Sequence, residues 1–184
     1  HKRYLGHTKQ SCINAYTQDY NLSNMNIFYL DPNPTIAARY HVDKHVVKMI
    51  LESAQILSTV HHINASDKRI LDNIYRPTHY HHPSTIWASQ NKNNYRWLFL
   101  LFAALLDEYT FRFGKTHKSS TLIDFLKEPP ESLSDDPFFP PTPAMEDEYL
   151  INGDSLLSYR NYYLRAKNHL FHWTKRSRPE WLIK

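Results

Sequence analysis

HVDKHVVKMILE, residues 41–52, is the stretch that decides the fold predicted for this chain. Its polar residues recur at steps of four and three, which is the spacing of one face of an α-helix. Valine, methionine, isoleucine and leucine occupy the other faces, so this helix should pack against a core. Continued by one turn, the polar face carries His41, His45, Lys48, Glu52 and Gln55.

This polar face supports two interpretations. The ordinary one is the solvated face of an amphipathic helix, in which Lys48 and Glu52 form an i,i+4 ion pair worth about 0.2–0.5 kcal/mol. If the face is buried instead, a desolvated Lys48 can act as a nucleophilic amine while Glu52 moves protons. His41 and His45 at i,i+4 also have a spacing that can bind a metal.

The composition fits one globular domain. The chain has 184 residues, 41% of them hydrophobic, and a net charge of +4, which is compatible with nucleic acid without requiring it. The single cysteine, Cys12, leaves no disulfide framework and no thiolate metal site. Three glycines cannot build a phosphate-binding loop, and no apolar run is long enough to span a membrane. We therefore expect an intracellular protein.

Residues 1–24 differ from the rest because they are polar and lack helical periodicity. We predict a leader or extension over 1–24 and a single helical domain over 25–184. Asn33 should cap the first long helix and Gly114 should end the second. Within the domain we expect a short extended segment at 26–30, long helices over 34–61 and 83–113, a short helix over 119–126, a C-terminal helix over 154–173, and loops over 64–82 and 128–149.

The predicted fold class is therefore mainly α. We expect a single compact helical domain with two long helices, a C-terminal helix and a long Pro-rich loop. The prolines of residues 128–149 require an extended, irregular path. A loop of that length within a compact domain is often functional, and a lid and a simple wrap around the core are both possible.

Charge is segregated towards the C-terminus. Residues 127–149 hold one lysine and seven acidic side chains, a net charge of −6, whereas residues 159–184 hold seven cations and one glutamate, a net charge of +6. Aromatic rings alternate with the cations of the second segment, and this combination can contact phosphates and stack on bases. The alternative is that the rings form the buried face of the last helix and the cations its solvated face.

Two further groups of side chains can carry chemistry. Trp87, Asn91 and Asn94 share one face of the second long helix, where amides beside a ring can contact a base. They can equally form a polar first turn before a buried helix. The histidines of residues 79–82 surround the start of that helix, but their spacing matches no defined metal motif. A metal-dependent hydrolase is therefore a weaker alternative.

Six segments carry a resemblance to a known family: Met25–Asp31, Asp43–Met49, His82–Trp87, Asp107–Lys115, Pro143–Met145 and Tyr159–Tyr163. They resemble small phage proteins described as pyrimidine dimer DNA glycosylases, and the similarity covers nearly all of residues 25–182. The resemblance implies a mainly helical DNA repair protein, which would act in the host cytoplasm if a phage encodes it. An amine attacks C1′ of the damaged nucleotide, the base leaves as a Schiff base forms, and β-elimination can nick the strand. A carboxylate assists, and no metal or organic cofactor is implied.

In the well-known small phage enzyme of this activity the amine is the N-terminus of the chain. Here twenty-four residues precede Met25, so Lys48 or Lys44 is the expected amine. Glu52 is the expected carboxylate, and the polar partners expected nearby are Asp43, His41 and His45.

The expected function is removal of damaged pyrimidines from DNA, with AP lyase activity as a second step, and it requires the target base to leave the stack. The expected DNA contacts are Arg76, His82, Trp87, Asn91, Asn94, Arg160, Tyr163 and Arg176. One alternative is a phage enzyme that modifies pyrimidines in DNA. The other is a helical protein without enzymatic activity that binds nucleic acid or a host factor.

Overall fold

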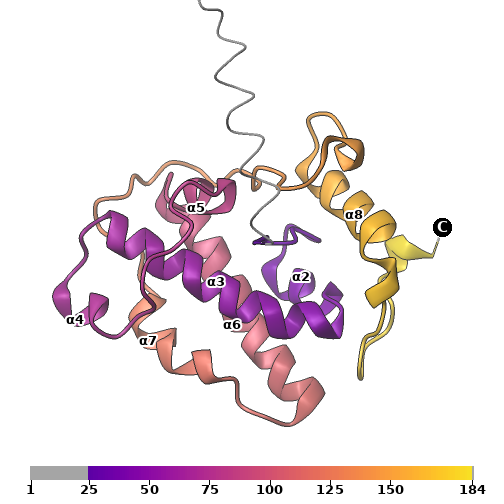
Figure 1. Ribbon diagram of the computed structural model, residues 1–184, viewed down its shortest axis with the longest axis horizontal. Coiled ribbons are helices and arrows are strands. Elements are labelled where there is room, and N and C mark those ends of the chain that lie inside the picture. Colours follow the sequence, from indigo (N-terminus) through magenta and orange to yellow (C-terminus); the bar gives the residue numbers. More distant parts are fainter. Residues whose placement is uncertain (1–24, 184) are drawn as a thin grey trace, which may run out of the picture.

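Two long helices, α3 (Asp43–Ile63) and α6 (Lys92–Phe113), pack along each other at the centre of the molecule (Figure 1). The computed structural model describes residues 25–183, which contain helices and no strand. The helices share a core in which Met49, Leu57, Leu98 and Leu105 are fully buried. This arrangement confirms the mainly α fold class. The predicted leader over 1–24, with Cys12, lies outside the described residues.

The first long helix is two helices, not one. α2 (Pro34–Tyr40) ends at His41, and Val42 is extended with φ −63° and ψ 156° before α3 begins. Arg112 stabilises the break by donating to the carbonyls of Arg39 and His41 at 2.9 and 2.8 Å. The prediction of one continuous helix over 34–61 is therefore wrong, because a distant arginine satisfies the carbonyls that the break exposes.

The second long helix is also interrupted. α5 (Pro83–Ala88) is followed by Asn91, whose extended backbone and side chain cap α6 by accepting the N–H of Asn94 at 2.8 Å. A polar residue that could continue a helix instead starts a new one. The predicted stop is confirmed, since Gly114 ends α6 in the left-handed conformation with φ +65°.

Shorter elements surround this core. Asn33 caps α2 as predicted, and its side chain accepts the N–H groups of Thr35 and Ile36. The remaining elements are α4 (Lys68–Leu71), η2 (Lys118–Leu122), α7 (Ile123–Leu126), η3 (Asp147–Tyr149), α8 (Ser155–Ala166), η4 (Asn168–Leu170) and η5 (Glu180–Leu182). The short helix predicted over 119–126 corresponds to η2 and α7, and the Pro-rich loop is irregular as expected apart from η3.

The C-terminal helix is shorter than predicted. α8 ends at Ala166, and the chain then turns and runs back beside it, as Figure 1 shows. Asp43 holds this returning segment, because its N–H donates to His172 O at 2.9 Å and its carboxylate accepts from Thr174. The prediction of one helix over 154–173 is therefore wrong at its C-terminal end, where η4 and a segment held by α3 follow α8.

Candidate functional site

The face of α3 that carries Lys48 and Glu52 is the candidate functional site. Lys48 Nζ lies 3.5 Å from Glu52 Oε1, and the two side chains are 45% and 11% exposed. Burial raises the pKa of Glu52 above its usual value, although the Asn26 N–H and the charge of Lys48 oppose that rise. Lys48 is therefore not desolvated in the way that the catalytic interpretation expected, and of the two only Glu52 is buried. The pair combines an accessible amine with a carboxylate that holds a proton more readily than a surface glutamate does.

A tight turn covers Glu52. The backbone N–H of Asn26 donates to Glu52 Oε2 at 3.0 Å. The Asn26 side-chain oxygen accepts the N–H groups of Ile27 and Phe28, and its amide donates to Ala144 O at 2.8 Å. Phe28 has φ +55°, a conformation that bulky residues rarely adopt. Such strain persists only where surrounding contacts impose it, and it is common at functional sites.

His45 is buried one turn before Lys48. The Val42 N–H donates to the Tyr163 hydroxyl at 2.8 Å, so the hydroxyl proton is directed to His45 Nδ1 at 2.9 Å. His45 is thus neutral with its proton on Nε2. Its ring stacks on Phe28 with centroids 4.3 Å apart. Burial, reinforced by nearby positive groups, lowers the pKa of His45 to about 2.

His82 joins the site from α5. Its Nδ1 accepts the N–H of Ser84 at 3.1 Å and caps that helix. Burial lowers the pKa of His82 to about 4, and a hydrogen bond with the Met25 backbone partly opposes this. Because Met25 contacts His82 and the next residue contacts Glu52, the turn connects α5 to α3. His82 therefore contributes to the site as a neutral, buried ring.

His41 and Asp43 do not join this group. His41 lies in the break before α3, where its Nδ1–H donates to Ala37 O at 2.7 Å. The prediction that it shares a helical face with His45 and later residues is wrong, because the helix starts at Asp43. Asp43 pairs with Arg112 at 3.0 Å and receives hydrogen bonds from the C-terminal segment. It stands about 14 Å from Glu52 along the helix axis.

Lys44, the other predicted amine, is exposed in the first turn of α3. No carboxylate among the described residues forms an ion pair with it. It therefore lacks the buried carboxylate partner that Lys48 has in Glu52.

Besides His82, four of the predicted DNA contacts are buried in the fold. Trp87 is fully buried, and its indole N–H donates to Phe139 O at 2.8 Å. Asn91 caps α6, and the Asn94 amide donates to Trp87 O while its oxygen accepts the Phe139 N–H. Tyr163 is also fully buried. In this structure the four side chains hold helices and loops together and present no surface to DNA.

The predicted arginine contacts differ in their surroundings. Arg160 donates to Leu30 O at 2.9 Å and lies 3.4 Å from an oxygen of Asp31. Arg176 pairs with Glu108, a carboxylate only 6% exposed. Arg76 is exposed on the loop before α5. Two of the three charges are therefore neutralised within the protein.

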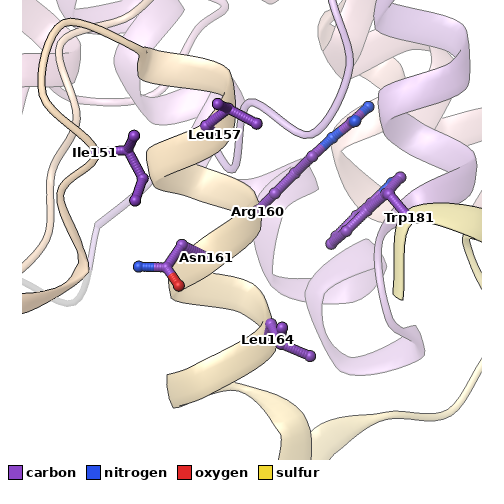
Figure 2. Close-up of a pocket in the computed structure, with 6 residues that line it drawn as sticks. All are labelled: Ile151, Leu157, Arg160, Asn161, Leu164 and Trp181. Carbon is purple, nitrogen blue, oxygen red and sulfur yellow. The ribbon is translucent and has the colours of Figure 1, made fainter. Parts of the chain in front are cut away.

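A shallow pocket of about 330 Å³ lies on the outer side of α8 (Figure 2). Its walls are mainly apolar, and the Arg160 guanidinium lies over the Trp181 ring at 5.0 Å from the ring centroid. The residues that form it are Ile151, Leu157, Arg160, Asn161, Leu164 and Trp181. It lies away from Lys48 and Glu52, neither of which lines it.

The sequence interpretation missed two residues that shape the site. Asn26 forms the turn over Glu52, and Phe28 stacks on His45. Both lie in the segment expected to be simply extended, and no local pattern distinguishes a strained turn from such a segment. Within residues 25–183, no cluster of three or more histidine, cysteine or acidic side chains is placed to hold a metal ion.

Comparisons of the chain with protein-family models, with curated proteins and with solved structures found no match. In the described part of the chain, no helix has the length and apolar character needed to cross a membrane.

Proposed function

We propose that this chain is a DNA glycosylase that removes damaged pyrimidines, with Lys48 as the nucleophilic amine and Glu52 as the assisting carboxylate. The observation that carries the proposal is the contact between Lys48 Nζ and the buried Glu52 carboxylate at 3.5 Å. Among the described residues, Lys48 is the one side-chain amine within ion-pair distance of Glu52. The resemblance to the phage glycosylases supports the choice of reaction.

The proposed chemistry needs a neutral amine and a group that exchanges protons beside it. Lys48 Nζ attacks C1′ of the nucleotide, and the bond between C1′ and the base breaks. Its electron pair leaves with the base, which takes up a proton. The C1′–O4′ bond then breaks, O4′ takes up the proton that the nitrogen loses, and a Schiff base links Lys48 to the opened sugar. Loss of a 2′ proton expels the 3′ phosphate, and water hydrolyses the imine to release the enzyme.

Glu52 suits the role of proton carrier because burial favours its protonated form. Its second oxygen is held by the Asn26 N–H, so the carboxylate is fixed while Oε1 faces Lys48. His45, neutral and one turn earlier, can donate a hydrogen bond from Nε2 without adding charge. The strained turn at Phe28 maintains this arrangement.

Reductive trapping tests the assignment of the amine. The full chain is incubated with ultraviolet-irradiated duplex DNA and borohydride, and the adduct is measured on a denaturing gel. We expect an adduct with the unmodified chain and none with Lys48→Ala. Lys44→Ala tests the other predicted amine and should keep the adduct, and Lys118→Ala, an exposed lysine elsewhere, is the matched control. A normal adduct in Lys48→Ala would overturn the assignment.

Peptide mapping of the adduct separates the remaining possibilities. The Asn26 nitrogen also contacts Glu52, but within the chain it is an amide and cannot form an imine. An adduct mapped to Asn26 would show that a cleaved chain uses its new α-amine as the nucleophile. Lys48 would then not be the amine, whereas Glu52 could still be the assisting carboxylate. No adduct with intact DNA binding would favour a protein that binds nucleic acid without acting on it.

A further inference from the structure

The C-terminal segment supplies every cation–ring contact found among the described residues. Each of its basic side chains between residues 160 and 178 lies over an aromatic ring at a distance of 4.2 to 5.8 Å from the ring centroid. The pairs are Arg160 with Trp181, Arg165 with Tyr149, Lys167 with Tyr162, Lys175 and Arg176 with Phe111, and Arg178 with Phe171.

These cations fall into two groups. Arg160, Arg165 and Arg176 pair with carboxylates of the fold. Lys167, Lys175 and Arg178 form no ion pair with any carboxylate of residues 25–183. We call these three residues the open cations. Their charge is positioned by a ring but is not neutralised.

A ring contact holds a long flexible side chain in place. Lysine and arginine lose rotamer entropy when they are fixed, and a cation–ring contact offsets part of that loss. Part of the cost of ordering Lys167 and Arg178 is therefore met before a ligand arrives. Preorganised cations without a carboxylate partner are suited to bind an anion.

The open cations begin beside the candidate site. Lys167 Nζ lies 4.9 Å from the Tyr162 ring, Tyr162 stacks on Phe28 at 6.2 Å, and Phe28 stacks on His45 at 4.3 Å. Positive charge from Lys167 also reaches His45. From there the segment turns past η4 and runs back along α8 (Figure 1). Lys175 and Arg178 lie on this returning segment, beyond Lys167 in the chain, and we call the three open cations along it the strip.

We propose that the open cations bind the phosphates of a nucleic-acid strand that runs outward from the site. The segment from residue 159 to 184 has a net charge of +6, and the acidic loop over 127–149 has −6. Because Arg160, Arg165 and Arg176 already pair with carboxylates, the open cations are favoured over them as contacts for a polyanion. That the polyanion is a nucleic-acid strand rests on the proposed function, since a glycosylase must hold the strand beside its target base. The strip itself is tested by binding alone.

The test measures the affinity of the full chain for a labelled oligothymidylate by anisotropy, between about 50 and 200 mM salt. The strip variant carries Lys167→Ala, Lys175→Ala and Arg178→Ala. The control variant carries Lys115→Ala, Lys118→Ala and Lys127→Ala, which removes the same charge from exposed lysines that contact no ring. Circular dichroism verifies that both variants are folded.

We expect the strip variant to bind more weakly and with a shallower salt dependence. A single strand loses a slope of about 0.7 for each phosphate contact, so three lost contacts reduce the slope by about 2. The control variant should keep the original slope. Equal losses in the two variants, or tighter binding of polyglutamate than of the oligonucleotide, would overturn the proposal.

A second pair of variants tests the contribution of the ring. Tyr162→Phe keeps the ring under Lys167, whereas Tyr162→Leu removes it. We expect the Phe variant to bind like the unmodified chain and the Leu variant to bind several-fold more weakly with an unchanged salt slope. Equal affinities would show that the ring does not position Lys167.

Failure of this inference differs from failure of the proposed function. If the unmodified chain forms no borohydride adduct but binds the oligonucleotide as expected, the glycosylase proposal is wrong and the role of the strip stands. If the strip variant forms a normal yield of adduct at elevated salt, the role of the open cations is wrong and the glycosylase proposal stands.

Discussion

Acidification should destabilise this protein before most of its carboxylates titrate. Burial lowers the pKa of His41, His61 and His82 to about 4 from the ordinary value of 6.5. The folded state therefore keeps these rings neutral while the unfolded state takes up protons. Stability is fully present above pH 6.5 and falls as the pH decreases towards 4.

The loss follows from the difference in proton uptake. At about pH 5 an unfolded histidine with its ordinary pKa is mostly protonated, whereas a folded one with a pKa near 4 is not. Each ring then costs about 2 kcal/mol of stability. His41, His61 and His82 together cost about 6 kcal/mol, and His45 adds to this in the same direction. Domains of ordinary stability have about 5–15 kcal/mol in all.

Urea unfolding followed by circular dichroism between about pH 7.5 and 5 measures this loss. His41→Asn is the informative variant, since an asparagine amide can donate to Ala37 O in place of Nδ1–H. It should be less stable near neutrality but lose about 2 kcal/mol less on acidification. His81→Gln, at an exposed position, is the control and should follow the unmodified chain. A free energy of unfolding that stays constant from pH 7 to 5 would refute the reasoning.

Three further predictions concern stability. Arg112→Met should lower the free energy of unfolding by about 3–5 kcal/mol in urea titrations, because it leaves Glu108 with Arg176 alone and removes the donors to the carbonyls of Arg39 and His41; a loss below about 1 kcal/mol would contradict the role given to this arginine. Tyr163→Phe should cost about 1–3 kcal/mol, measured in the same way, since the Val42 N–H loses its acceptor; an unchanged urea midpoint would argue against that bond. Gly114→Ala should lower the thermal midpoint by a few degrees because of its positive φ, and an unchanged midpoint would show that the helix end relaxes freely.

The fold class followed from periodicity, but the two helix breaks did not. One break depends on a side chain whose partners are distant in sequence, and the other on a residue type that is found both within helices and at their caps. Arg112 reaches the carbonyls of Arg39 and His41 across the core. Asn91 has a side chain that either continues a helix or caps one, and only its packing decides between the two. Local propensity contains neither piece of information.

The candidate site was predictable in part. The spacing of Lys48 and Glu52 on one face was visible in the sequence, and the structure brings them to 3.5 Å. The burial of Glu52 was not visible, because it comes from a turn that lies 26 residues earlier. The aromatic residues of the C-terminal segment divide, since Tyr163 is buried as the buried-face interpretation predicts, while Tyr162 carries Lys167 on its ring. Contact of these rings with nucleic acid stays a prediction.

The Pro-rich loop acquires a specific role from these contacts. Ala144 O accepts the Asn26 amide at 2.8 Å, and the Ala144 N–H donates to the Tyr159 hydroxyl at 3.3 Å. One loop residue thus joins α8 to the turn that covers Glu52. Prolines restrict the unfolded loop, so they lower the entropy lost when this residue is placed. The loop therefore contributes to the site by fixing the main chain against the carboxylate.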